Sequence, residues 1–129
     1  MPSPSLSPYS IEDAPKGRPQ ITELHYDVWT LRITLDFEDW DGAVYLDFES
    51  PAGFRVMEEG DLQEVWQDKN TTKHWLHVVE SGGWLALESS REGFTQEASE
   101  LREFFVAGVS DCVSVLAFDD PVITVVGGE

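Results

Sequence analysis

The stretch WTLRITLDFE, residues 29–38, alternates apolar and polar side chains along its whole length. Successive side chains of a β-strand point to opposite faces of the sheet, so a period of two indicates a strand with one buried and one exposed face. The positions predicted to be buried are Trp29, Leu31, Ile33, Leu35 and Phe37. This segment predicts a β-rich domain, and the rest of the chain is interpreted on that basis.

A second alternating run, VYLDFE at residues 44–49, lies just beyond Asp41-Gly42, a dipeptide favoured in hairpin turns. The two runs therefore predict a β-hairpin. With residues 39–42 as the loop, Arg32 would face Glu49 on the exposed side. A two-residue loop at Asp41-Gly42 would shift the register by two residues and keep every side chain on the same face.

The other predicted elements are short and are separated by turn residues. Strands are expected at residues 54–57, 74–80, 84–88, 113–118 and 122–126. Ser81-Gly82-Gly83 would join two of them as a second hairpin. The capping-box pattern from Asp61 to Glu64 predicts one or two helical turns that end near Asn70.

Residues 95–107 are compatible with two structures. Thr95 can cap a helix that carries Ala98, Leu101 and Phe105 on one face and stops at Gly108, and this helix is the prediction. A strand at residues 104–109 is the alternative.

These segments together predict one α+β domain over residues 20–129. It would have six or seven mostly antiparallel strands and one or two short helices, and the length of 129 residues suits a single domain. Residues 1–19 hold five of the seven prolines and little apolar periodicity, so they are predicted to be a flexible Pro/Ser-rich tail.

The charge balance excludes several classes of partner. The chain carries 25 acidic and 8 basic residues, a formal net charge of −17. Affinity for nucleic acid comes largely from Lys and Arg, so neither a nucleic acid nor an anionic membrane is expected as a partner. The sequence contains no apolar run of membrane-spanning length and no signal-peptide pattern, so a cytoplasmic location is expected.

The residues that could carry chemistry form no recognisable constellation. His74 and His77 are three apart, which on a strand places them on opposite faces. Cys112 is the single cysteine, too few for a disulfide or a cysteine-based zinc site. The acids between Asp36 and Asp41 could supply calcium ligands, but they lack the spacing of an EF-hand loop. We therefore expect a protein that is not an enzyme and binds no metal and no cofactor.

The acidic residues are concentrated in one part of the chain. Residues 36–68 hold eleven acids and a single base, Arg55. Such a concentration destabilises the fold by self-repulsion, so it serves either solubility or a cationic partner. The residues predicted to bind a basic protein partner are Asp36, Glu38, Asp39, Trp40, Asp41, Tyr45, Asp47, Glu49, Glu58, Glu59, Asp61 and Glu64.

Trp40 has two interpretations. It lies between Asp39 and Asp41 in a predicted turn, where an aromatic ring ringed by acids is typical of an interface anchor with a steering rim. Alternatively, the turn folds back and the ring packs on the core.

Three phrases of the sequence resemble a known type of protein. They are GFRV with EGDL and Trp66 (residues 53–66), GGWLALE (82–88) and DCVSVL (111–116), and the interval from the first to the last spans about half of the chain. They are similar to small bacterial immunity proteins encoded beside polymorphic or contact-delivered toxins. The resemblance implies inhibition of a cognate toxin in the cytoplasm of the producing cell, and an acidic surface could occupy the basic cleft of such a toxin. The rival interpretation is a small β-rich ligand-binding or scaffold module whose acidity serves solubility.

Overall fold

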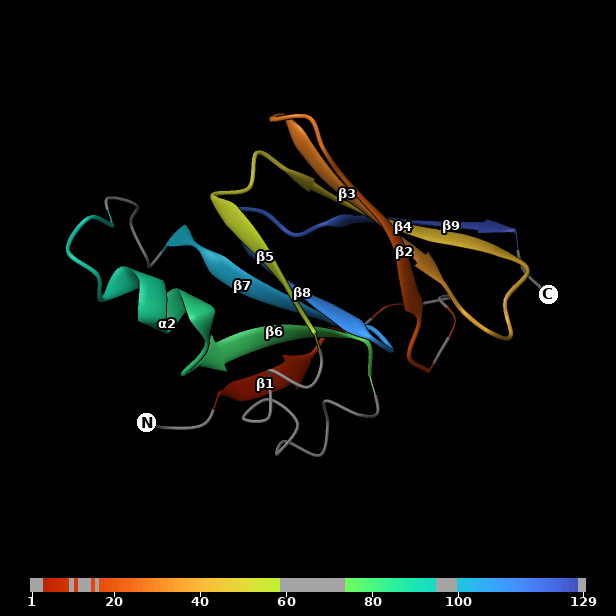
Figure 1. Ribbon diagram of the computed structural model, residues 1–129, viewed down its shortest axis with the longest axis horizontal. Coiled ribbons are helices and arrows are strands. Elements are labelled where there is room, and N and C mark those ends of the chain that lie inside the picture. Colours follow the sequence, from red (N-terminus) through yellow and green to blue (C-terminus); the bar gives the residue numbers. More distant parts are fainter. Residues whose placement is uncertain are drawn as a thin grey trace.

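The structure is a computed structural model, and it describes residues 4–9, 11, 15, 17–58, 74–94 and 100–127. These residues form nine β-strands and one short helix. The strands pair in antiparallel fashion. They build two sheets that pack against each other through a shared core (Figure 1). The predicted single α+β domain, with mostly antiparallel strands and one or two short helices, is confirmed in outline. The strands form two sheets and number nine in the described residues, where six or seven were expected.

The four-stranded sheet contains the predicted hairpin. Its spatial order is β2 (Gln20–Tyr26), β3 (Thr30–Asp36), β4 (Gly42–Glu49) and β9 (Val122–Gly127). The period of two along β3 and β4 is confirmed, because Leu31, Ile33, Leu35, Val44, Leu46 and Phe48 are all fully buried.

The hairpin register differs from the prediction by two residues, because its loop is longer than expected. Arg32 lies opposite Asp47, and Leu35 lies opposite Val44. Phe37 leaves the strand pairing and is buried in the core, and its carbonyl oxygen accepts the N–H of Trp40 at 3.1 Å. A two-residue shift keeps every side chain on its predicted face.

Trp29 is not buried, which corrects the prediction made from its place in the alternation. Strand β3 begins at Thr30, so Trp29 belongs to the turn that precedes it. Its side chain is 74% exposed, the highest value among the large hydrophobic side chains described.

The five-stranded sheet includes part of the segment predicted to be a flexible tail. Its spatial order is β1 (Ser5–Pro8), β6 (Leu76–Ser81), β7 (Arg102–Ala107), β8 (Asp111–Ala117) and β5 (Gly53–Glu58). Strand β1 pairs with β6 and buries Leu6, so these four residues belong to the sheet. A four-residue strand that follows Pro4 and ends at Pro8 offers too short an apolar pattern to be recognised by periodicity.

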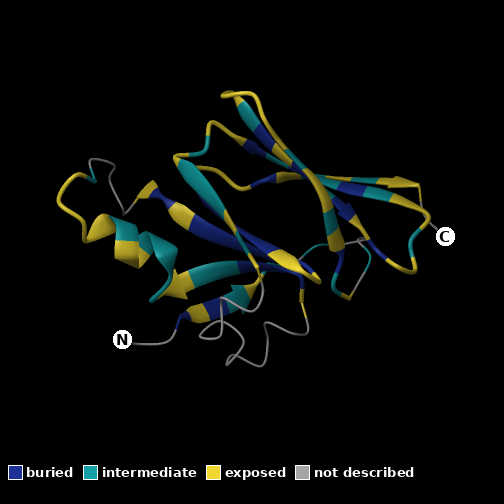
Figure 2. Cartoon of the chain, viewed as in Figure 1, coloured by how far each residue is buried: buried dark blue, intermediate teal, exposed yellow. Residues whose placement is uncertain are grey.

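The main core lies between the two sheets, where the buried positions of both meet (Figure 2). Phe48 of β4 and Phe104 of β7 contact each other across this layer, with ring centroids 5.4 Å apart. Burial of one such side chain contributes about 1.5–3 kcal/mol. The interior of the sandwich therefore fixes which face of the four-stranded sheet points outward.

Helix α2 (Trp84–Ser89) replaces the strand predicted at residues 84–88. Its sequence consists mainly of good helix formers, and the Glu103 carboxylate accepts the N–H of Leu85 at 2.8 Å. The predicted second hairpin is therefore wrong: β6 pairs with β1 and β7.

Strand β7 replaces the helix predicted to end at Gly108, so the strand alternative is the correct one for this part. Residues 103–107 are buried on both faces of the sheet. An uninterrupted apolar run such as residues 104–107 shows neither the period of two of a strand nor the period of about 3.6 of a helix, so periodicity alone cannot tell the two apart. Thr95 and Ala98, and the helical turns predicted from Asp61 to Asn70, lie outside the described residues.

Candidate partner-binding surface

The four-stranded sheet and the turns between its strands carry the larger acidic excess of the two sheets. Residues 20–49, which make β2, β3, β4 and their turns, contain eight acids and one arginine. Seven of these acids are exposed, namely Glu23, Asp27, Asp36, Glu38, Asp39, Asp41 and Glu49. We call this surface the acidic face.

Arg32, the one arginine of the acidic face, is already paired. Its Nε donates to Asp47 Oδ1 at 2.8 Å and its Nη2 to Asp47 Oδ2 at 2.9 Å, a bidentate contact. The guanidinium also lies over the Tyr45 ring, 4.5 Å from its centroid. The hydrogen bonds to Asp47 raise the pKa of Arg32. Asp47 is therefore neutralised locally, and the unpaired negative charge lies around it.

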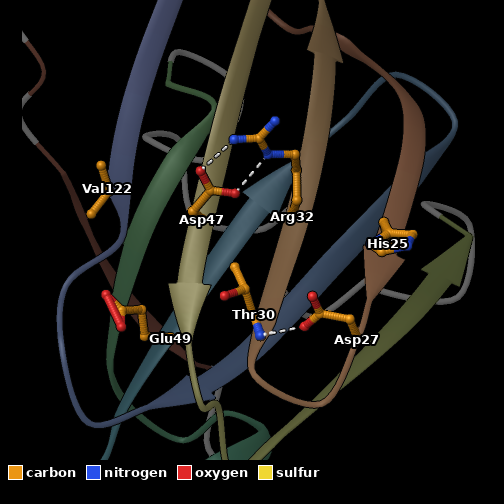
Figure 3. Close-up of a pocket in the computed structure, with 7 residues that line it drawn as sticks. All are labelled: His25, Asp27, Thr30, Arg32, Asp47, Glu49 and Val122. Carbon is orange, nitrogen blue, oxygen red and sulfur yellow. Dashed lines mark hydrogen bonds and ion pairs between the residues drawn. The ribbon is translucent and has the colours of Figure 1, made fainter.

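An open hollow of about 590 Å³ lies on the acidic face (Figure 3). Side chains from all four strands of the sheet and from the β2–β3 turn surround it: His25, Asp27, Thr30, Arg32, Asp47, Glu49 and Val122. Six of the seven residues that line it are polar or charged, whereas sites for small molecules are usually lined by apolar and aromatic side chains. The hollow suits a polar side chain of a protein partner better than a buried organic ligand.

Asp27 organises the turn at the edge of this hollow. Its Oδ1 accepts the N–H of Thr30 at 2.8 Å and the N–H of Trp29 at 3.0 Å. These hydrogen bonds, that of Thr30 first, lower the pKa of the Asp27 carboxyl. Aspartate commonly bonds backbone N–H groups two or three residues on, and this is the sequence signal that could have identified residues 27–30 as a turn.

Val28 and Trp29 project from that turn. Their side chains are 66% and 74% exposed. The φ angle of Val28 is 84°, an uncommon conformation for a β-branched residue. Sequence reasoning assigned Trp29 to the core and so missed this exposed apolar pair, which we call the apolar tip.

Trp40 lies at the opposite end of β3 from the apolar tip, in the β3–β4 loop. Its ring is partly buried against the core, and its Nε1 donates to the carbonyl oxygen of Val126 at 3.2 Å. The structure therefore supports the interpretation in which the turn folds back.

The residues predicted to bind a partner are only partly brought together. Asp36, Tyr45, Asp47 and Glu49 lie on strands of the acidic face, and Glu38, Asp39 and Asp41 flank Trp40 in its loop. Glu58 is separated from them, because it lies on β5 of the other sheet, opposite Asp111. Glu59, Asp61 and Glu64 lie outside the described residues.

His77 and Cys112 both lie on strands of the five-stranded sheet. His77 is fully buried and its Nε2 lies 2.8 Å from the carbonyl oxygen of His74, while Cys112 is buried on β8. Within the described ranges, no three His, Cys, Asp or Glu side chains come close enough to hold a metal ion. Nor does any described helix have the length and apolar character needed to cross a membrane.

Fold and surface together define a small antiparallel β-sandwich with one acidic, outward-facing sheet. Comparison of the chain with protein-family models, with curated proteins and with solved structures found no match.

Proposed function

We propose that this chain is a non-catalytic, protein-binding inhibitor: an immunity protein that neutralises a cationic toxin domain in the cytoplasm of a bacterium. The observation that carries the proposal is the acidic face, where eight acids meet one arginine that is already paired with Asp47. Complementary charge steers a cationic partner toward such a surface and disfavours other partners. The resemblance of three sequence phrases to immunity proteins agrees with this function.

A co-purification experiment tests whether the partner exists. The tagged full-length chain is recovered from its native organism, and the proteins retained with it are identified by mass spectrometry. The proposal expects one predominant basic protein with a toxin-like domain. Consistent recovery of an acidic partner would contradict it.

The role of charge in binding is tested with the purified chain, its purified partner and two variants of the chain that have equal net charge. The face variant combines Asp36→Asn, Asp39→Asn, Asp41→Asn and Glu49→Gln. The control variant combines Glu80→Gln, Glu92→Gln, Glu100→Gln and Asp111→Asn, four exposed acids outside the acidic face.

At low salt, the association rate of the face variant should fall about tenfold or more, whereas the control variant should fall much less. The difference should shrink at high salt, because screening shortens the range of the field. Equal rates for the two variants would place the interface elsewhere.

A further inference from the structure

The apolar tip, Val28 and Trp29, has no packing role that accounts for its composition. Trp29 is the most exposed large hydrophobic residue described, whereas Trp40, Trp75 and Trp84 are partly or fully buried. Tryptophan is highly buried on average and is enriched among the residues that dominate binding energies at interfaces.

Backbone contacts hold the tip in a defined conformation. Asp27 accepts two N–H groups of the turn, and the N–H of Ser50 donates to the carbonyl oxygen of Trp29 at 2.7 Å. The turn is thus tied both to its own aspartate and to the end of β4. A side chain presented on an ordered turn loses less conformational freedom on binding, so more of its contact energy appears as affinity.

The surroundings of the tip specify the charge of its partner. Asp27 and Thr30, the residues on either side of the tip, line the hollow, and Glu49 forms another part of its wall. The turn that carries the apolar tip therefore borders a recess whose lining carries three carboxylates against one arginine. This arrangement complements a surface that has an apolar recess with a lysine or arginine at its rim.

We infer that the apolar tip is the anchor of the interface, with Trp29 inserted into an apolar recess of a cationic protein and the hollow receiving a basic side chain beside it. The inference rests on the proposed function and refines it, because it centres the interface on the β2–β3 turn at the end of β3 opposite Trp40. A second copy of this chain is a poor occupant, since the net charge of −17 opposes self-association.

A displayed library of random peptides is the probe for this inference. Peptides are selected on the full-length chain and then measured against Trp29→Ala, against the face variant, and against Leu87→Ala, which removes another exposed apolar side chain, on α2. Trp29→Ala should keep the wild-type melting temperature and circular dichroism, because the ring is exposed.

The expected result is enrichment of peptides that combine Lys or Arg with large apolar residues. Trp29→Ala should weaken their binding about 30-fold or more, the loss typical of an interface hot spot. Leu87→Ala should stay within about twofold of wild type.

Basic peptides that bind Trp29→Ala as well as wild type, but lose affinity for the face variant, would overturn the anchor and leave the proposed function standing. Neutral or acidic peptides that depend on Trp29 would overturn the cationic partner and with it the proposed function. Failure of any peptide to prefer wild type over Trp29→Ala would overturn the inference. So would a wild-type dimer in analytical ultracentrifugation that Trp29→Ala dissociates, because the occupant would then be a second copy.

Discussion

At the residue scale, Glu103 is the most unusual group of the described chain. It is a carboxylate on β7 that is only 3% exposed. Burial raises the pKa of its carboxyl, while the N–H groups of Leu85 and Trp84 and the charge of Arg55 act in the opposite direction. Glu103 thus anchors the start of α2 to the five-stranded sheet, at the cost of keeping a charge away from water.

The direction of the pKa shift determines how the contribution of Glu103 to stability depends on pH. A carboxyl whose pKa is higher in the folded than in the unfolded state binds its proton more tightly when folded, so its contribution to stability is least favourable above the folded pKa. The contribution improves as the pH falls through the folded pKa toward the unfolded value of about 4.3.

Glu103→Gln should therefore stabilise the protein at pH 7 by an amount on the order of 1 kcal/mol, because the amide oxygen can still accept an N–H of α2 and no charge is buried. This advantage over wild type should shrink as the pH is lowered through the folded pKa. Denaturant unfolding at a series of pH values measures the difference. An advantage of Glu103→Gln that grows toward acid pH would show that folding does not raise the pKa of Glu103.

Glu103→Ala provides the contrast, since it removes the acceptor as well as the charge. It should destabilise the protein by about 1–3 kcal/mol at pH 7, the cost of leaving a buried N–H without a partner.

At the element scale, the turn between β6 and α2 depends on a close approach. A Cβ at Gly83 would lie 2.7 Å from Val79 Cγ1 and 2.8 Å from Glu103 Oε1. Val79 is β-branched and stiff at χ1, and Glu103 Oε1 is held by the N–H of Leu85, so neither atom can retreat easily. Glycine at this position lets the chain reach the carboxylate that anchors the helix.

Gly83→Ala should therefore destabilise the protein by about 1–3 kcal/mol, the usual cost of overpacking. Gly93→Ala is the matched control, since among the described residues its Cβ would meet the terminal Nη1 of Arg91 alone. Thermal or urea unfolding monitored by circular dichroism compares the two. Equal losses would mean that the contact with Glu103 is not the cause.

Strands β3 and β4, helix α2 and Trp29 show why some elements could be predicted from sequence and others could not. Alternation along β3 and β4 is a local property of side chains that face one core, so the buried face was predictable, whereas the register depends on how Phe37 leaves the strand. Helix α2 depends on Glu103, which is distant in sequence, and the exposure of Trp29 depends on where β3 begins. Tertiary contacts outweighed the local pattern at each of these places.

At the scale of the whole molecule, the net charge of −17 has two explanations that the sequence alone leaves equal. If acidity serves only solubility, its position is unimportant. If it serves a partner, one surface keeps a repulsive cluster that the fold would be more stable without, a known trade-off between function and stability. The two explanations make different predictions for the acidic face, which has seven exposed acids.

Unfolding of the face variant and the control variant at low salt separates these explanations, since each removes four negative charges. Three of the four charges that the face variant removes, those of Asp36, Asp39 and Asp41, lie within six residues of one another at one end of β3. Removing neighbouring charges relieves more repulsion than removing charges from dispersed positions, so the face variant should be the more stable of the two. Added salt should narrow the gap through screening, whereas a neutral osmolyte should not. A face variant that is more stable and yet binds its partner more slowly would show that the cluster is kept for binding. Equal stability of the two variants would favour solubility as the explanation.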